Sequence, residues 1–257
     1  MAKLGDTIYY RDETEEHSGF DRKKLTIDDR YRYLHKSPLW HMAAFLVNRV
    51  MMTPIAFLHT KLKYHHKIVG AKALRTTRGA FLYGNHTMYA ADAFIPHMLT
   101  FPRRTQLLVG SENLSVYGTR TFLALNGAMP LPTTYRALPN LKGAIHTHLK
   151  NGRVIGIYPE AHIWPYYTGI RPFSETAFAF PVEEGAPVFC FTNTFHKRKV
   201  GRLPKVVTYV DGPFYPDPSL SKREQIKALA AKVQSVMKER AALSTYTPIT
   251  YLHEENQ

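Results

Sequence analysis

The chain has 257 residues, of which 44% are hydrophobic and 21% are charged, and its formal net charge is +14. These are the values of a globular protein that can bury a sizeable core, so a disordered chain is excluded. The single cysteine, Cys190, excludes a disulfide framework and a zinc cluster built on cysteines. Because Cys190 lies in an apolar run, we expect it to be buried and unreactive.

The histidines and the first residues exclude two further classes. The thirteen histidines show neither an HExxH pattern nor a Cys/His spacing, so we expect no metal and no other cofactor. Residues 1–17 lack the basic-then-apolar layout of a signal peptide. We therefore expect a protein of the cytoplasm, or of the cytoplasmic face of the cell membrane.

The positive charge is unevenly distributed along the chain. Residues 1–36 hold as many acidic as basic residues and are expected to form a polar arm. Between Asp29 and Asp92 there is no acidic residue, and Glu112 is the only acidic residue among residues 93–158. Such a basic surface attracts polyanions, which are either nucleic acids or anionic lipids.

The apolar stretch Pro38–Leu58 favours the lipid. It is long enough to cross a bilayer, but Arg49 at its centre costs about 2.5–3.5 kcal/mol on insertion scales, which disfavours a lone spanning helix. We expect a helix lying in the membrane interface, or a shallow helical hairpin broken near Pro54. The alternative is a core helix packed on its own domain. The interfacial contacts expected from this region involve two aromatic residues and three lysines: Trp40, Phe45, Lys61, Lys63 and Lys67.

After this stretch, strand-like and helix-like segments alternate. The strand-like runs are short and apolar: Lys67–Val69, Ala80–Tyr83, Gln106–Val109, Ala128–Leu131, Val154–Tyr158, Val188–Thr192 and Val206–Val210. The helix-length segments between and after them are Ala90–Leu99, Leu114–Leu125, Leu138–Lys150, Ser174–Glu184 and Lys222–Glu239. This alternation predicts an α/β fold with a mostly parallel sheet flanked by helices. The expected organisation is a polar arm (1–36), a membrane-associating segment (37–62), one catalytic domain (63–245) and a tail (246–257).

Polar residues follow two of the predicted strands. His86 comes just after the strand at 80–83, and Pro159-Glu160 follows the strand at 154–158. Because the carboxyl ends of parallel strands meet at one edge of a sheet, these residues are expected to lie together. His86 and Asp92, at a strand-to-helix turn, are suited to act as a general base and the group that orients it. The alternative is a surface histidine and an aspartate that favours the helix dipole.

Four sequence blocks of this chain resemble, in their order and spacing, those of the glycerophospholipid acyltransferases. This family includes the lysophosphatidic acid (1-acylglycerol-3-phosphate) acyltransferases. The blocks are Asn85-His86 with Asp92, then Gly127–Leu131, then Tyr158-Pro159-Glu160, and a tract with Phe173, Ala177, Glu183, Gly185 and Pro187. Ile68-Val69-Gly70 is similar to the strand that the family places before the first block. The resemblance covers about residues 65–212.

The resemblance implies acyl transfer from a thioester, of acyl carrier protein or coenzyme A, to a hydroxyl of a lysophospholipid such as 1-acylglycerol-3-phosphate, in phospholipid biosynthesis. It implies that His86 is the base and Asp92 its partner. The substrate-binding residues that it suggests are Asn85, Gly127, Arg136, Glu160 and Arg171. Arg136 and Arg171 would hold an acceptor phosphate, with a solvated surface role as the alternative, and Glu160 would orient the acceptor hydroxyls or cap a turn. The expected partners are thus an anionic membrane surface, the acyl donor and the acceptor, and no nucleic acid.

The chain departs from the family pattern in two important places. Asp92 lies one residue further from His86 than usual, and one residue is about 100° of rotation on a helix, so the turn must absorb it. The arginine that usually follows the third block to hold the acceptor phosphate is replaced by Ile163. Two alternatives therefore remain: a catalytically silent lipid-binding relative with a broken His–Asp pair, and a basic nucleic-acid-binding domain. No RNA-recognition signature or zinc finger supports the second.

Overall fold

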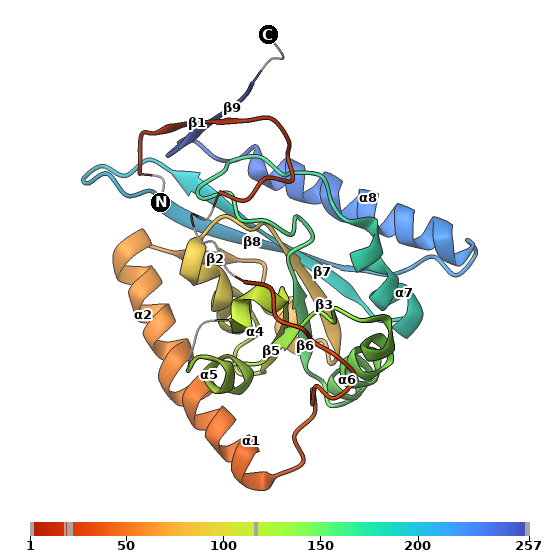
Figure 1. Ribbon diagram of the computed structural model, residues 1–257. Coiled ribbons are helices and arrows are strands. Elements are labelled where there is room, and N and C mark those ends of the chain that lie inside the picture. Colours follow the sequence, from red (N-terminus) through yellow and green to blue (C-terminus); the bar gives the residue numbers. More distant parts are fainter. Residues whose placement is uncertain (1–2, 18, 20–22, 116–117, 255–257) are drawn as a thin grey trace.

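The structure is a computed structural model that describes residues 3–17, 19, 23–115 and 118–254 (Figure 1). Within these residues, seven strands form one sheet in the order β2-β8-β7-β3-β6-β4-β5. The five strands from β7 to β5 run parallel, whereas β8 is antiparallel to β7 and carries β2 at its outer edge. The strands are β2 (Lys67–Val69), β3 (Ala80–Gly84), β4 (Thr105–Val109), β5 (Ala128–Pro130), β6 (Val154–Ile157), β7 (Val188–His196) and β8 (Lys205–Phe214). Each of them was predicted from the sequence, so the expected α/β fold with a mostly parallel sheet is confirmed.

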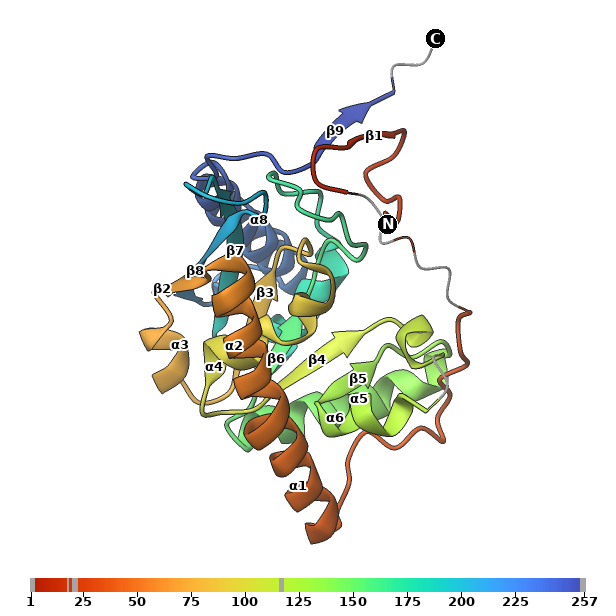
Figure 2. The same ribbon diagram turned by 90° about the vertical axis from the view of Figure 1, so that its left-hand side faces the viewer.

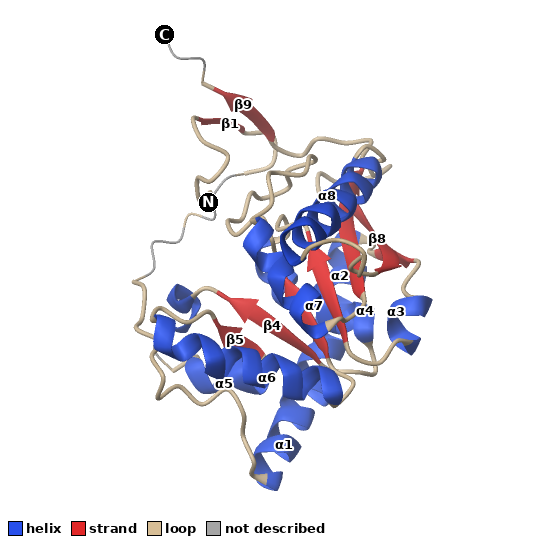
Figure 3. Ribbon diagram, turned by 90° about the vertical axis from the view of Figure 1, so that its right-hand side faces the viewer, coloured by secondary structure: helices blue, strands red, loops and turns tan. Residues whose placement is uncertain are grey.

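Helices cover both faces of the sheet. The helices α6 (Leu138–Lys150), α7 (Ala179–Glu184) and α8 (Lys222–Ala241) lie on one face (Figure 3). The helices α2 (Thr53–Tyr64), α3 (Lys72–Thr76) and α4 (Ile95–Thr100) lie on the other (Figure 2), and α5 (Arg120–Leu125) contacts α1 (Pro38–Phe45). Short 3₁₀ segments precede four of these helices: η2 (Tyr89–Ala93), η3 (Ser111–Leu114), η4 (Tyr135–Ala137) and η5 (Glu175–Phe178). The sequence did not predict α3 or η4, and it merged η2 with α4 and η5 with α7.

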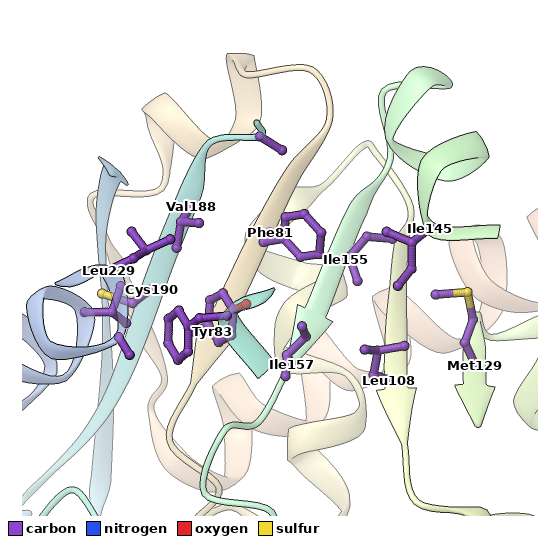
Figure 4. Packing of buried hydrophobic residues seen from close by; sticks show 14 of the residues in the cluster. Phe81, Tyr83, Leu108, Met129, Ile145, Ile155, Ile157, Val188, Cys190 and Leu229 are labelled. Carbon is purple, nitrogen blue, oxygen red and sulfur yellow. The ribbon is translucent and has the colours of Figure 1, made fainter. Parts of the chain in front are cut away.

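The core has two halves because successive strand residues point to opposite faces. Phe81 and Tyr83 of β3 pack in the cluster beneath α6, α7 and α8 (Figure 4), whereas Ala80 and Leu82 pack in the cluster beneath α2, α3 and α4. Cys190 of β7 belongs to the first cluster and is fully buried, as predicted, and its burial raises the pKa of the thiol. A run such as Ala80–Gly84 is apolar throughout because both of its faces are covered.

The segment from Pro38 to Tyr64 is one helix of 27 residues, and an 18-residue window within it has a mean hydropathy of 1.3, so the helix is long and apolar enough to cross a membrane. It comprises α1, a π-helical segment η1 (Leu46–Met52) and α2. Of the two expected forms, the hairpin broken near Pro54 is wrong, because the helix continues through the proline. Both the backbone N–H and the hydroxyl of Thr53 donate to the Asn48 carbonyl, so the π-helical turn already interrupts the regular ladder where the proline lacks its N–H.

This helix turns the polar residues at its centre inward and most of its large apolar residues outward, while His41, His59, Lys61 and Lys63 towards its ends are exposed. Asn48, Arg49 and Thr53 are 0%, 5% and 1% exposed. The Asn48 amide contacts His97 and Asn126, and an Arg49 N–H donates to the His97 carbonyl at 3.4 Å. The exposed side chains are large and apolar: Leu39, Met42, Phe45, Leu46, Val50, Met51, Ile55, Phe57, Leu58 and Leu62. Arg49, which argued against a spanning helix, is therefore directed into the protein.

The N-terminal arm and the C-terminal tail are joined to each other. The strand β1 (Thr7–Tyr10) pairs in parallel with β9 (Thr250–His253) in a separate two-stranded sheet, which the sequence did not predict (Figure 1). Further along the arm, Ile27 and Tyr33 are buried in the domain core, and the Tyr33 hydroxyl donates to the Pro130 carbonyl at 2.9 Å. The arm thus contributes to the packing of the main domain.

Candidate active site

His86 and Asp92 form a hydrogen-bonded pair just beyond the carboxyl end of β3. His86 Nδ1 lies 2.7 Å from Asp92 Oδ2, and the two side chains are 24% and 2% exposed. Because a carboxylate accepts, Nδ1 carries the proton and Nε2 is the basic nitrogen. In the part of the chain that the structure describes, no hydrogen bond engages Nε2, which leaves it available to take a proton from a substrate.

The turn between the two residues absorbs the extra residue. It is a 3₁₀ segment, η2, which winds more tightly than an α-helix, and Tyr89 at its start has a left-handed φ of 48°. That conformation is unfavourable for a bulky residue and is a local strain of the kind found at functional sites. Asp92 Oδ2 also accepts from the Met88 backbone N–H at 2.8 Å, which closes the turn.

Tyr158, directly after β6, contacts both members of the pair. Its ring stacks on the His86 ring with centroids 4.3 Å apart and an interplanar angle of 19°. Its hydroxyl donates to the Asp92 carbonyl at 2.6 Å, and burial raises the pKa of this phenol, so it stays a neutral donor. Sequence reasoning assigned Tyr158 no role. The available signal was an aromatic residue between a buried strand and Pro159-Glu160.

Burial sets the electrostatics of the pair. Loss of water around Asp92 raises the pKa of its carboxyl group, and the hydrogen bond and charge of His86 oppose that rise. Asp92 Oδ1 is buried without a hydrogen-bond partner among the described residues. A poorly solvated carboxylate interacts strongly with a neighbouring cation, so this geometry favours the imidazolium that forms when His86 takes a proton.

Glu160 fixes the backbone of His86. Its Oε2 accepts from the His86 backbone N–H at 3.3 Å and from Arg171 Nη2 at 3.1 Å, and both side chains of this ion pair are essentially buried. Arg171 also donates to the carbonyls of Glu13 and His162. Burial raises the pKa of Glu160, and the charge of Arg171 opposes the rise.

The substrate contacts expected of Asn85, Glu160 and Arg171 are replaced by contacts within the protein. Asn85 is 1% exposed, and its side-chain amide donates to the Asn193 carbonyl at 3.1 Å and accepts from the Asn193 N–H at 2.8 Å. Arg171 is enclosed by Glu160 and by carbonyl groups, so taking up a phosphate would leave a buried carboxylate unpaired. In this structure the three residues hold strand ends and loops in place around His86.

Gly127 and Arg136 lie on opposite edges of the sheet. Gly127 precedes β5 with a φ of +90°, and a Cβ there would lie 2.6 Å from the Thr105 carbonyl oxygen. Gly127 thus lies where the amino ends of the strands meet, at the edge of the sheet opposite His86. Its role is to allow this backbone conformation, and it does not contact substrate at His86. Arg136, in η4, is exposed beyond the carboxyl end of β5, three strands from β3 and hence about 14 Å along the edge that carries His86.

Sequence reasoning also missed the loop at 160–171. Its backbone pairs with the residues around the catalytic histidine: the Trp164 N–H donates to the His86 carbonyl at 3.1 Å, and the Tyr166 N–H to the Thr87 carbonyl at 2.8 Å. Irregular loops have no periodicity from which such pairing can be predicted. The aromatic cluster around Trp164 was the available signal.

Comparison with known proteins agrees with this geometry. Residues 65–192, which contain His86, Asp92 and Tyr158, match the family model described as Acyltransferase. The structure is similar to the crystal structure of the 1-acyl-sn-glycerophosphate (LPA) acyltransferase PlsC from Thermotoga maritima, with a TM-score of 0.54 and 17% sequence identity over 81% of this chain and 97% of that chain. A search among curated proteins gives no match. The structural likeness shows a shared fold, and the family model covers the residues that form the site. The chain therefore belongs to the acyltransferase family and is an O-acyltransferase.

Proposed function

We propose that this protein transfers an acyl chain from a thioester to the free hydroxyl of a lysophospholipid, with His86 as the general base. The observation that carries the proposal is the 2.7 Å contact between His86 Nδ1 and the buried Asp92 carboxylate, which leaves Nε2 basic. The structural neighbour acts on 1-acyl-sn-glycerophosphate, so a phosphorylated lysophospholipid is the first acceptor to consider.

In the proposed reaction, His86 Nε2 takes the proton of the acceptor hydroxyl as its oxygen attacks the thioester carbonyl carbon. Asp92 stabilises the resulting imidazolium. The carbon–sulfur bond then breaks, and the imidazolium returns the proton to the departing thiolate. The products are an ester and a free thiol, and these reaction steps require no acyl-enzyme and no cofactor.

The donor is proposed to be acyl carrier protein or coenzyme A, both of which present a phosphate-bearing thioester arm to this basic protein. Arg136 is exposed beyond the end of β5, and β5 lies about 14 Å from β3 across the sheet, so Arg136 suits a phosphate far from the reacting hydroxyl. The acceptor phosphate remains the proposed ligand of Arg136, and the phosphates of the donor are the alternative. Kinetics of Arg136→Ala separate the two, because the Michaelis constant should rise for whichever substrate Arg136 binds.

We further propose that the helix Pro38–Tyr64 binds the membrane through its apolar side. Its ten large exposed apolar residues have no cover in the described chain, whereas the polar residues at its centre, Asn48, Arg49 and Thr53, are buried. This exposed apolar side supports a peripheral or monotopic protein. The proposed location is the cytoplasmic face of the cell membrane, where both kinds of donor occur.

The test is to offer the purified protein acyl carrier protein and coenzyme A thioesters with a panel of lysophospholipids, and to identify products by mass spectrometry. The proposal expects a diacyl product whose formation is lost in His86→Ala. Absence of any acylated product with every donor and acceptor, from a folded and vesicle-bound protein, would favour a silent lipid-binding relative.

A further inference from the structure

A cavity of about 380 Å³ lies at the amino ends of β4, β5 and β6, on the opposite edge of the sheet from His86. Its walls come from the arm at 31–36, the start of α1, and the helices α5 and α6 (Figures 1 and 2). From Arg153 at its rim to Tyr158 beside His86 is five steps of about 3.3 Å along β6, or about 17 Å. The cavity is therefore distinct from the active site.

The cavity is lined by basic residues and, among the described lining residues, by no carboxylate. The permanent cations are Arg32, Lys36, Arg104 and Arg153, and the lining histidines are His35, His41 and His148. Partial burial together with neighbouring charge lowers the pKa of Arg104 to about 10. Concentrating uncompensated cations around a concave space attracts an anion.

Three buried donors in this lining lack an acceptor. His148 is 5% exposed, and its Nδ1 lies 3.1 Å from Arg153 Nη1. Because a guanidinium can only donate, Nδ1 accepts, and the proton of the neutral ring is on Nε2. Burial lowers the pKa of His148 to about 3, so the ring is neutral at pH 7. His148 Nε2, Gln106 Nε2 and Arg104 Nε are all buried without a hydrogen-bond partner among the described residues.

Unpaired buried donors are unfavourable, and an oxygen-rich anion in the cavity would satisfy those that a small side-chain movement exposes at its wall. Arginine guanidinium groups match phosphate oxygens in geometry as well as in charge. The volume is in the range of sites for small molecules and suits a headgroup rather than a single ion.

The cavity also adjoins the proposed membrane surface. Trp40 and His41 of α1 form part of its wall, and Trp40 stacks on His35 with centroids 3.8 Å apart. The neighbouring residues Leu39 and Met42 are 71% and 56% exposed. A ligand with its phosphate in the cavity can thus have its apolar chains beside the exposed side of α1.

We propose that this cavity binds the phosphate headgroup of an anionic phospholipid and so orients the protein on the membrane. The proposal rests on the membrane contact proposed above, but not on the acyl-transfer chemistry. A soluble phosphate ester offers the same oxygens, and the experiment must separate the two sources.

The test compares flotation of the full chain with phosphatidylcholine vesicles that contain either phosphatidylglycerol or an equal mole fraction of oleate, which has a carboxylate charge. We expect tighter binding to phosphatidylglycerol, and a loss of about tenfold or more in Arg104→Gln/Arg153→Gln that is confined to those vesicles. Arg104→Lys/Arg153→Lys, which keeps the charge but loses the guanidinium geometry, should lose most of the preference. Should the inner variants not fold, Arg32→Gln/Lys36→Gln in the exposed rim should reduce the same preference.

The matched control is Lys61→Gln/Lys63→Gln, which removes the same charge from the helix without touching the cavity. It should weaken binding to both vesicle types equally. Equal losses on both vesicle types for the cavity variants would show only a diffuse basic surface and overturn the proposal. Calorimetric binding of glycerol 3-phosphate that needs Arg104 and Arg153, with unchanged vesicle binding in the same variants, would assign the cavity to a soluble phosphate and overturn the headgroup. Failure of acyl transfer would leave all of these readouts intact.

Discussion

Two buried carboxylates meet at His86, and each holds a different part of it. Asp92 binds the imidazole ring, whereas Glu160 binds the backbone N–H and is itself paired with Arg171. The Asp92 contact orients the imidazole ring and stabilises its protonated form, whereas the Glu160 contact fixes the position of the His86 backbone. Arg171 is thus a positioning residue, which acts through Glu160 and through the loop that carries both.

This assignment predicts the stability of Arg171 variants. Arg171→Ala leaves the buried Glu160 carboxylate without its partner, so the free energy of unfolding should fall by about 3–5 kcal/mol. Urea unfolding measures the loss. The matched control Glu160→Gln/Arg171→Met removes both charges and should lose clearly less. If Arg171→Ala unfolds like the wild type and only weakens acceptor binding, the arginine contacts substrate after all.

The sequence predicted that His86, Asp92 and Glu160 lie together, but not what each of them touches. The motifs identified His86, Asp92 and Glu160 because charged groups just after buried strands are unusual. They could not show that Asn85 is consumed by the Asn193 backbone or that Gly127 faces the other edge, because those contacts join residues far apart in sequence. The extra residue before Asp92 was a concern only on an α-helix, and the observed turn is 3₁₀.

At the scale of elements, the centre of the helix Pro38–Tyr64 has the reverse of the usual polarity, with Asn48 and Arg49 buried and large apolar residues exposed. The apolar composition and length of Pro38–Leu58 predicted a helix, but which side faces the protein depended on tertiary partners for Asn48 and Arg49 that lie in α4 and at the end of α5. The strands were predictable because both faces of a central strand are covered. The pair β1–β9 was not, because it joins the two ends of the chain.

Substitutions on the exposed side of this helix should separate membrane binding from folding. Phe45→Asp and Leu58→Asp place a charge where side chains are 55% and 61% exposed. Each removes about 1.5–3 kcal/mol of apolar transfer from vesicle binding while leaving the melting temperature nearly unchanged. Vesicle flotation and thermal unfolding measure the two quantities. As a control, Lys227→Asp on the exposed side of α8 should leave vesicle binding in place; equal binding by all the variants would mean that another surface meets the membrane.

At the scale of the whole molecule, the two chain ends brace the active-site loop. Tyr251 of β9 stacks on Trp164 with centroids 4.8 Å apart, and its hydroxyl donates to the Pro165 carbonyl at 2.9 Å. Trp164 in turn donates its indole N–H to the Glu15 carbonyl at 2.7 Å. The loop that fixes Arg171 and Glu160 is thus held by residues from both termini.

Loosening this brace should change the loop before it changes the core. Tyr251→Ala is expected to speed amide hydrogen exchange across 160–171 and to lower turnover, because the loop backbone pairs with His86 and Thr87. Tyr251→Phe keeps the stacking and should have a smaller effect. Exchange that rises equally in β3 and β6 would indicate general destabilisation and contradict a local brace.

Buried neutral histidines should make the fold sensitive to acid. Burial lowers the pKa of His66 to about 4 and that of His97 to about 3, with smaller effects from Lys61 on the first and from Arg49 and Arg104 on the second. An unfolded histidine titrates near pH 6.5, so below that pH the unfolded chain binds protons that the folded chain excludes. The free energy of unfolding should therefore be constant above about pH 6.5. It should fall as the pH decreases toward 4, by up to about 1.4 kcal/mol per pH unit for each histidine.

Urea midpoints at pH 7, 6 and 5 measure this slope. The variant His66→Gln should show a shallower slope than the wild type, because one excluded proton has been removed. His196, near the surface in β7, offers the control substitution His196→Gln, which should change the slope less. Identical slopes in wild type and His66→Gln would contradict a buried neutral His66.

The most direct test of the account is the single-turnover rate of acyl transfer in variants of the His86–Asp92 pair, with the fold of each checked by thermal unfolding. General-base catalysis predicts a loss of about 10²–10⁴-fold for His86→Ala. A severe loss is also expected for Asp92→Asn, since the amide favours the wrong tautomer and cannot stabilise the imidazolium. Glu112, a carboxylate just after β4 and two strands from β3, offers the control Glu112→Gln, which should turn over at near the native rate. Near-native turnover by a folded His86→Ala protein would contradict the account.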